Sequence, residues 1–130
     1  MDERDRYAGG LKVRRAALGE AYVDASLARR NAFNTDFQDL ITRYAWGEIW
    51  TRPGLPRHSR SLITLGLMIA QNRPDEFRLH LRAAFNNGVT RDEIRELILH
   101  CAIYAGVPAA NSAMHQAEEV FRELDRAAGA

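Results

Sequence analysis

The sequence has 130 residues, of which 46% are hydrophobic and 27% are charged, and its formal net charge at pH 7 is +1. These values predict a single globular domain over residues 1–130, and they exclude both a disordered chain and a nucleic-acid-binding protein with a broad basic surface. Lys12 is the only lysine, so 17 of the 18 basic residues are arginine, the side chain best suited to bidentate recognition of carboxylates.

The sequence shows no targeting or membrane-spanning segment. The opening residues MDERDRYAGG are charged and contain no apolar signal core. The longest apolar run, residues 62–70, is about half as long as a membrane span. We therefore expect a cytoplasmic protein with no membrane segment.

Apolar residues recur at every third or fourth position along most of the chain, which is the spacing of amphipathic helices. Residues 62–70 are apolar on almost every side, which predicts a central helix with all of its faces covered. No stretch alternates between apolar and polar residues as a half-buried strand does. The sequence therefore predicts an all-α fold of six or seven helices, at residues 2–17, 20–30, 33–49, 57–71, 74–87, 91–105 and 108–127.

Local signals support these boundaries. Thr90 and Glu93 have the spacing of a capping box, and Gly88 just before them ends the preceding helix. Gly106 followed by Pro108 ends one helix and begins the next. Residues 51–56 contain two prolines and a glycine, so they form a loop.

The stretch ITRYAWGEIWTRPGLPRHSR, residues 41–60, is the first candidate site. It contains both tryptophans, four arginines, a histidine and a single acid, Glu48. In one interpretation Trp46 and Trp50 are core or subunit-interface residues and the arginines are a solvated rim. In the other, the stretch forms an anion pocket with Glu48 in its wall. Composition leaves the two interpretations about equal.

His80 is a second candidate, because its helix position borders a stripe formed by Phe77 and Ala84. A histidine there is more often a partly buried structural residue, but histidine is also the side chain best suited to proton transfer near neutral pH. The only cysteine, Cys101, falls on an apolar helix face and is expected in the core. No spacing in the sequence indicates a metal site or a phosphate-binding loop, so we expect neither metal nor nucleotide cofactor.

Three long strings carry a specific resemblance: ITRYAWGEIWTRPGLPRHSRS, FRLHLRAAFNNGVTRDEI and AIYAGVPAANSAMHQAEEV. With the opening DERDRYAGGLKVRRAALG, they resemble the 4-carboxymuconolactone (γ-carboxymuconolactone) decarboxylases over nearly the whole length. The resemblance implies an all-α fold of the alkylhydroperoxidase D-like class, a homo-oligomer (a hexamer in relatives) and no cofactor. It also implies decarboxylation of 4-carboxymuconolactone to β-ketoadipate enol-lactone, in protocatechuate catabolism by the β-ketoadipate pathway.

One departure from the wider class is informative. Its peroxide-reducing members carry a CxxC motif, then a histidine four residues after the second cysteine and a glycine eight residues further on. His80 and Gly88 match the histidine and the glycine, but Arg73 and Glu76 occupy the cysteine positions. This difference argues against a peroxidase and favours acid–base chemistry.

The implied substrate is a small dicarboxylate lactone. Loss of CO2 from its γ-carbon sends an electron pair through the ring alkene into the lactone carbonyl, so the substrate itself is the electron sink. On this view Arg43, Arg52 or Arg57 holds the carboxylate that survives the reaction. Trp46 offers an apolar wall to the carboxylate that leaves.

The chemical step requires a proton for the carbon next to the carbonyl. His80 is the first candidate for the donor, and His58 is the second because it follows the basic loop. Glu48 either repels the departing carboxylate or, if burial keeps it protonated, donates a hydrogen bond. We expect Glu48, His80 and at least one of the three arginines to meet in one pocket.

Two other classes of function stay open. A related helical decarboxylase or isomerase could act on another lactone or a β-keto acid, with different arginines contacting the substrate. A helical interaction module without catalytic activity would instead surround Trp46 and Trp50 with apolar groups and keep Glu48 far from His80.

Overall fold

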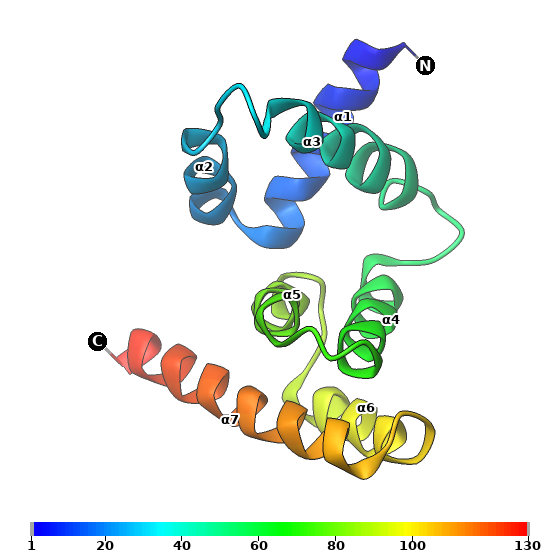
Figure 1. The fold of residues 1–130 in the computed structure, drawn as a ribbon, viewed down its shortest axis with the longest axis vertical. Coiled ribbons are helices and arrows are strands. Elements are labelled where there is room, and N and C mark those ends of the chain that lie inside the picture. The colour runs from blue at the N-terminus through cyan, green and yellow to red at the C-terminus, as the bar shows by residue number, and fades with distance from the viewer. Residues whose placement is uncertain (1, 130) are drawn as a thin grey trace. The chain divides into compact units, whose positions relative to one another are not determined.

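The computed structural model describes residues 2–129, and all of its regular structure is helical (Figure 1). No strand occurs in this range, so the all-α prediction is confirmed. The elements are α1 (Glu3–Leu18), α2 (Glu20–Ala28), α3 (Thr35–Leu40), the π-helix η1 (Ile41–Ile49), α4 (Arg57–Ala70), α5 (Pro74–Asn86), α6 (Arg91–Tyr104) and α7 (Val107–Gly129).

The predicted punctuation is confirmed. Thr90 accepts a hydrogen bond from the Glu93 amide, and the Glu93 side chain accepts one from the Thr90 amide, which completes the capping box of α6. Gly88 and Gly106 have φ angles of +84° and +110°, values that glycine adopts without steric cost. Gly88 lies two residues after the end of α5 and Gly106 two residues after the end of α6, so each glycine follows the helix that it terminates.

The helix predicted over residues 33–49 begins later than expected and changes type. The Asn31 side chain accepts hydrogen bonds from the amides of Phe33 and Asn34, and this local turn competes with helix formation. The helix therefore starts at Thr35. From Ile41 it continues as a π-helix, and its last bond runs from the Trp50 amide to the Ala45 carbonyl.

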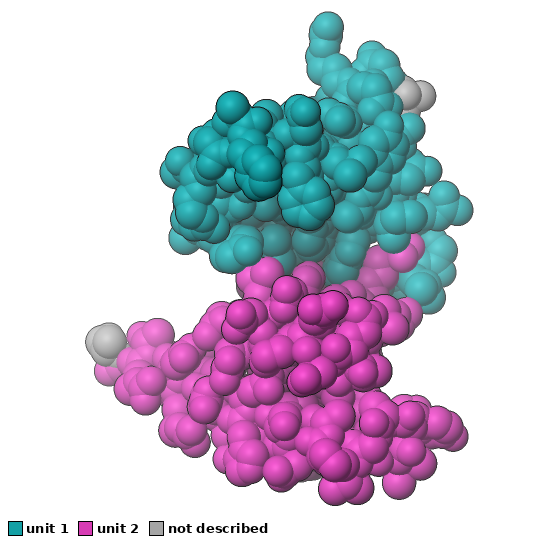
Figure 2. All heavy atoms as spheres, viewed as in Figure 1, with its two compact units in different colours: residues 1–57 teal, residues 58–130 magenta. Residues whose placement is uncertain are grey.

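The chain divides into two compact units (Figure 2). Unit 1 is Met1–Arg57 and contains α1, α2, α3 and η1. Unit 2 is His58–Ala130 and contains nearly all of α4 together with α5, α6 and α7. The single domain expected over residues 1–130 stays a prediction.

Unit 1 is built on a very close crossing of α1 and η1. Gly10 of α1 is buried, and a methyl group there would collide with the Thr42 carbonyl oxygen and lie 2.8 Å from the Gly47 amide nitrogen. A methyl group on Gly47 would collide with the Arg6 carbonyl oxygen. The atoms in the way are backbone atoms, so only glycine fits at either position.

A buried arginine lies one turn beyond this crossing. Arg14 is 6% exposed, and its guanidinium donates hydrogen bonds to Ser26 (3.0 Å), Gln38 (3.2 Å) and Thr42 (3.3 Å). These partners are uncharged, and burial lowers the pKa of Arg14. The guanidinium thereby connects α1 to α2, α3 and η1.

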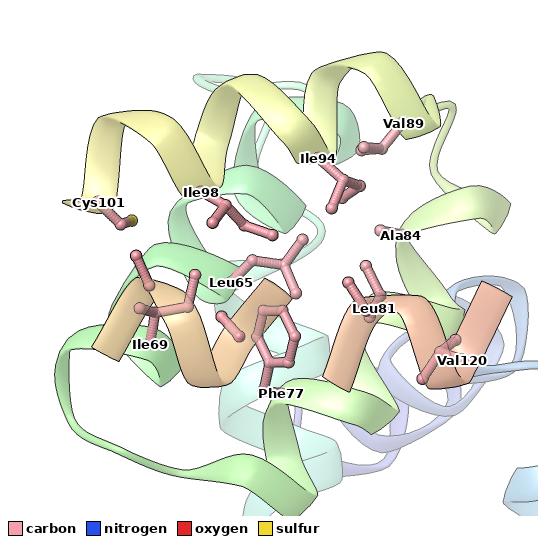
Figure 3. Packing of buried hydrophobic residues seen from close by; sticks show 13 residues of the cluster. Leu65, Ile69, Phe77, Leu81, Ala84, Val89, Ile94, Ile98, Cys101 and Val120 are labelled. Carbon is pink, nitrogen blue, oxygen red and sulfur yellow. The ribbon is translucent and has the colours of Figure 1, made fainter. Parts of the chain in front are cut away.

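Unit 2 has the larger apolar core, to which all four of its helices contribute (Figure 3). Phe77 is the largest side chain in it, at 1% exposure, and burial of such a ring contributes about 1.5–3 kcal/mol. The helices contribute Leu65 and Ile69 from α4, Phe77, Leu81 and Ala84 from α5, Ile94, Ile98 and Cys101 from α6, and Ala110, Ala113, Ala117 and Val120 from α7. The expectation for Cys101 is confirmed.

One expectation about apolar faces is wrong for the chain by itself. In α4, Leu65 is buried but Ile63 and Leu67 are each 50% exposed, so this helix is not covered on every side. Phe33 and Phe37 follow a helical rhythm, yet they are 95% and 64% exposed. Periodicity identifies a helix and its apolar side, but it does not say what covers that side.

Gly10→Ala is expected to destabilise the protein by about 1–3 kcal/mol, because the backbone of η1 cannot move away from the added methyl group. Gly9→Ala is the matched control, since nothing lies within 4 Å of a methyl group at that neighbouring position of α1. Alanine there should stabilise the helix by about 0.5–1 kcal/mol. Urea unfolding followed by circular dichroism measures both changes, and equal stabilities for the two variants would contradict the close crossing.

Candidate functional site

The stretch around Glu48 lies in a chain of alternating charges within unit 1. Glu48 forms an ion pair with Arg6 of α1, and Arg52 lies 4.0 Å from its other oxygen. Arg6 also lies 3.3 Å from Glu3, which is 3.4 Å from Arg43. Three guanidinium groups therefore share two carboxylates, which leaves one positive charge in excess.

Tyr44 of η1 joins this chain of charges. Its hydroxyl donates a hydrogen bond of 2.7 Å to Glu3, and the Arg6 guanidinium lies 5.2 Å from the centre of its ring. The hydrogen bond from Tyr44 is the main reason why the pKa of Glu3 is lowered. The bond to Glu48 likewise raises the pKa of Arg6.

The tryptophans are packing residues. Trp46 is 5% exposed and packs with Val13 and Ala17 of α1, and the partly buried Trp50 lies against the same cluster. The two rings are 4.8 Å apart between centroids. The rings therefore belong to the core of unit 1, as the first interpretation expected, and the anion pocket of the second interpretation stays a prediction. The proposed role of Trp46 as a wall for substrate stays a prediction.

Sequence reasoning missed Glu3 and Arg6, which are partners of Arg43 and Glu48. Their own i,i+3 spacing is visible in DERDRY. The ion pair between Arg6 and Glu48 joins residues 42 positions apart, so no local pattern identifies it.

In unit 2, His58 has an acidic partner that the sequence did not indicate. Its Nε2 atom lies 2.7 Å from Oε2 of Glu93, and about a third of each side chain is exposed. The contact with His58 is the main reason why the pKa of Glu93 is lowered. This pair connects the start of α4 to the first turn of α6.

His80 has a different environment. It is half-buried on α5, between the fully buried Phe77 and Ala84, as the helical spacing predicted. Burial lowers the pKa of His80, and the nearby carboxylate of Glu76 opposes this shift. Glu48 and His80 belong to different units, so their convergence stays a prediction.

Three further observations concern Arg57, metal binding and membrane-spanning helices. Arg57 is exposed and pairs with no acid that the structure describes. Within residues 2–129, no three His, Cys, Asp or Glu side chains are grouped so that they could hold a metal ion. No helix in the same range is long and apolar enough to cross a membrane.

Tyr44→Phe is expected to raise the pKa of Glu3 toward its ordinary value, because the phenylalanine ring cannot donate the hydrogen bond that favours the ionised carboxylate. Carboxyl-carbon NMR titration measures the change. Tyr22→Phe is the control, since the Tyr22 hydroxyl makes no hydrogen bond with the residues described. An unchanged titration of Glu3 in Tyr44→Phe would contradict the contact.

Comparison with known proteins identifies the family. Residues 35–119 match the family described as Carboxymuconolactone decarboxylase. The chain is 60% identical to 4-carboxymuconolactone decarboxylase of Acinetobacter baylyi over 124 residues, which cover 95% of this chain and 92% of that protein. It is 47% identical to nitrosuccinic acid decarboxylase of Metarhizium robertsii over 115 residues, 88% of this chain and 80% of that protein. The chain therefore belongs to the carboxymuconolactone decarboxylase family.

Proposed function

We propose that this chain is a cofactor-independent carboxy-lyase that converts 4-carboxymuconolactone to β-ketoadipate enol-lactone and CO2. The observation that carries the proposal is the similarity to the Acinetobacter baylyi enzyme over nearly the full length of both chains. The proposal includes a cytoplasmic location and a place in protocatechuate catabolism by the β-ketoadipate pathway.

The protein must perform three functions in this reaction. It must hold a dianionic substrate, stabilise the oxygen of the dienolate that forms when CO2 leaves, and protonate the carbon next to the carbonyl. The lactone accepts the electron pair, so no cofactor is required for delocalisation. We assign these three functions to arginines, a carboxylate and two histidines.

Arg57 is the arginine best suited to hold the carboxylate that survives the reaction. Arg43 and Arg52 already lie beside Glu3 and Glu48, so binding a substrate there competes with an acid of the protein. Arg57 has no acidic partner among the described residues. We assign it the first contact with the substrate and keep Arg43 and Arg52 as further binding residues.

Glu48 acts as an ionised carboxylate in this proposal. It forms an ion pair with Arg6 of α1, and a protonated Glu48 that donates a hydrogen bond stays the alternative. A fixed negative charge next to the leaving carboxylate raises the energy of the ground state and is relieved as neutral CO2 departs. Trp46, which packs in the core of unit 1, is assigned to the apolar wall.

Both histidines are assigned to the site, and both act on charge that is present only in the transition state. One donates a proton to carbon, and the other donates a hydrogen bond to the dienolate oxygen. His80→Asn keeps polarity and much of the volume of the side chain, but it removes the imidazole.

A second substrate is favoured by one observation, the 47% identity to nitrosuccinic acid decarboxylase. A nitro group, like the conjugated lactone, accepts an electron pair. Nitrosuccinate and 4-carboxymuconolactone also both carry two carboxylates, so one arrangement of arginines can hold either molecule. Nitrosuccinate is therefore the competing candidate substrate.

The proposal is tested with purified protein and either compound, following substrate loss and CO2 release without added metal or nucleotide and with a chelator present. We expect turnover of the lactone, with kcat/KM higher than for nitrosuccinate. Turnover of nitrosuccinate alone would replace the proposed substrate. Turnover of neither would favour an interaction module without catalytic activity.

His80→Asn is expected to lower kcat and kcat/KM together by about 10²–10⁴-fold, because the lost interaction exists only in the transition state. Arg57→Ala should mainly raise KM, by an amount worth about 1–3 kcal/mol, because it contacts a group that does not react. Arg126→Ala, in the last turn of α7, is the control. Steady-state kinetics would contradict these roles if His80→Asn kept normal turnover and a normal pH profile.

A homo-oligomer, with a hexamer as the expected form, is also part of the proposal. Several apolar side chains are uncovered in the chain by itself, including Ile103, Tyr104 and Val107 at 78%, 80% and 67% exposure. Ile103→Asp should reduce the sedimentation coefficient at micromolar concentration, because it places a charge on such a surface. Asn111→Asp introduces the same charge at an exposed polar position and should not. A monomeric wild-type chain with full activity would contradict the assembly.

A further inference from the structure

The pair formed by His58 and Glu93 has a well-defined geometry within unit 2. Nε2 of His58 lies 2.7 Å from Oε2 of Glu93, which is a short distance for a hydrogen bond between an N–H group and a carboxylate. The two residues come from the starts of α4 and α6, 35 positions apart. The contact therefore depends on the packing of these two helices.

The Glu93 carboxylate cannot turn freely, because each of its oxygens has its own partner. Oε1 accepts a hydrogen bond of 2.9 Å from the Thr90 amide, and the Glu93 amide donates one of 3.2 Å to the Thr90 hydroxyl. The capping box thus fixes one oxygen of Glu93, and the other oxygen is directed at His58. Glu93 therefore both caps the start of α6 and orients the imidazole of His58.

This arrangement selects the tautomer of His58. An ionised carboxylate only accepts hydrogen bonds, so Nε2 carries a proton in both the neutral and the charged imidazole. Nδ1 is the atom that gains and loses a proton. About a third of the His58 side chain is exposed, so the imidazole has access to solvent.

We propose that His58 is the proton donor of the decarboxylation and that Glu93 is the residue that positions it. This inference rests on the proposed function. It gives Glu93 a role beyond capping α6, namely positioning His58. It also gives the two histidines different roles in the reaction.

The environment of His80 suits the other task. Its burial disfavours the charged imidazole and lowers its pKa, so near neutral pH the ring is mainly neutral. A neutral imidazole is a poor acid toward carbon, but its N–H can donate a hydrogen bond to the dienolate oxygen. Two histidines in unlike surroundings can therefore divide the reaction between them.

The proposed step balances. The bond between the γ-carbon and the leaving carboxylate breaks, CO2 departs, and the electron pair moves through the ring alkene to the carbonyl oxygen of the lactone. The dienolate then takes the Nδ1 proton of charged His58 at the carbon next to the carbonyl, which becomes a methylene group. Neutral His58 keeps its proton on Nε2, still hydrogen-bonded to Glu93, and takes a new proton from water at Nδ1.

Glu93 lines a groove of about 390 Å³ between α4 and α6, together with Leu62, Asp92, Glu96, Leu97 and His100. Arg57 and Arg60 are the charged residues nearest to His58 along α4. Of the pair, Glu93 is the residue that faces this groove.

The first test needs no substrate. Glutamine also completes a capping box, so Glu93→Gln keeps the bond to the Thr90 amide and turns its NH2 group toward Nε2. The neutral His58 ring should then change from the Nε2–H to the Nδ1–H tautomer, which nitrogen-15 NMR of the ring distinguishes, with His58→Asn for assignment. An Nδ1–H tautomer in the wild type would overturn the proposal whatever the enzyme's substrate.

The second test is kinetic. Glu93→Gln should lower kcat about 10- to 100-fold with little change in KM and alter the pH profile, because part of the rate supplied by a positioned acid is lost. Glu96→Gln removes a charge from the same groove and should change neither kcat nor the tautomer. Thr90→Ala weakens only the cap, so it should cost stability and leave kcat unchanged. Normal kcat and a normal pH profile in Glu93→Gln would make Glu93 a capping residue only.

The third test separates the histidines. In D2O the wild-type enzyme should place deuterium on one face of the new methylene carbon, because a fixed donor delivers it. His58→Asn should give both faces, since the dienolate is then protonated by solvent, whereas His80→Asn should be slow but keep one face. Loss of facial selectivity in His80→Asn alone would make His80 the donor. A wild-type protein without turnover would refute the proposed function and leave the tautomer result standing.

Discussion

The close crossing of α1 and η1 determines where the polar groups of unit 1 lie. With Gly10 and Gly47 at the contact, the backbones approach so closely that side chains on either side of it must face each other. Arg6, one turn before Gly10, then meets Glu48, and Arg14, one turn after, meets Thr42. The alternating charges around Glu48 and the buried position of Arg14 thus both follow from the antiparallel packing of α1 against η1.

The π-helical form of η1 lies at this crossing and contains the acid assigned to the site. Such wider turns are uncommon and occur frequently at functional positions. Here the segment directs Trp46 into the core of unit 1 and leaves Glu48 half-buried beside Arg6 and Arg52. Aromatic packing and charge placement are therefore set by the same nine residues.

Unit 2 places its two candidate histidines in opposite environments. His58 has an ionised carboxylate as its partner, while His80 is on the edge of the apolar core of α5. Glu76 is one turn before His80 and partly offsets the effect of burial on its pKa. Unit 2 thus holds one imidazole against a carboxylate and the other against the apolar core.

The amino-acid sequence by itself determined the helices, their order and the family, because caps, glycine stops and apolar periodicity act over a few residues and long strings identify relatives. The capping box of Thr90 and Glu93, the stop at Gly106 and the buried Cys101 were all predictable in this way. Only the tertiary structure decided that Arg6 pairs with Glu48 and that Glu93 holds His58. These contacts join residues far apart in the chain, and their geometry depends on how closely the helices pack, which no local pattern records.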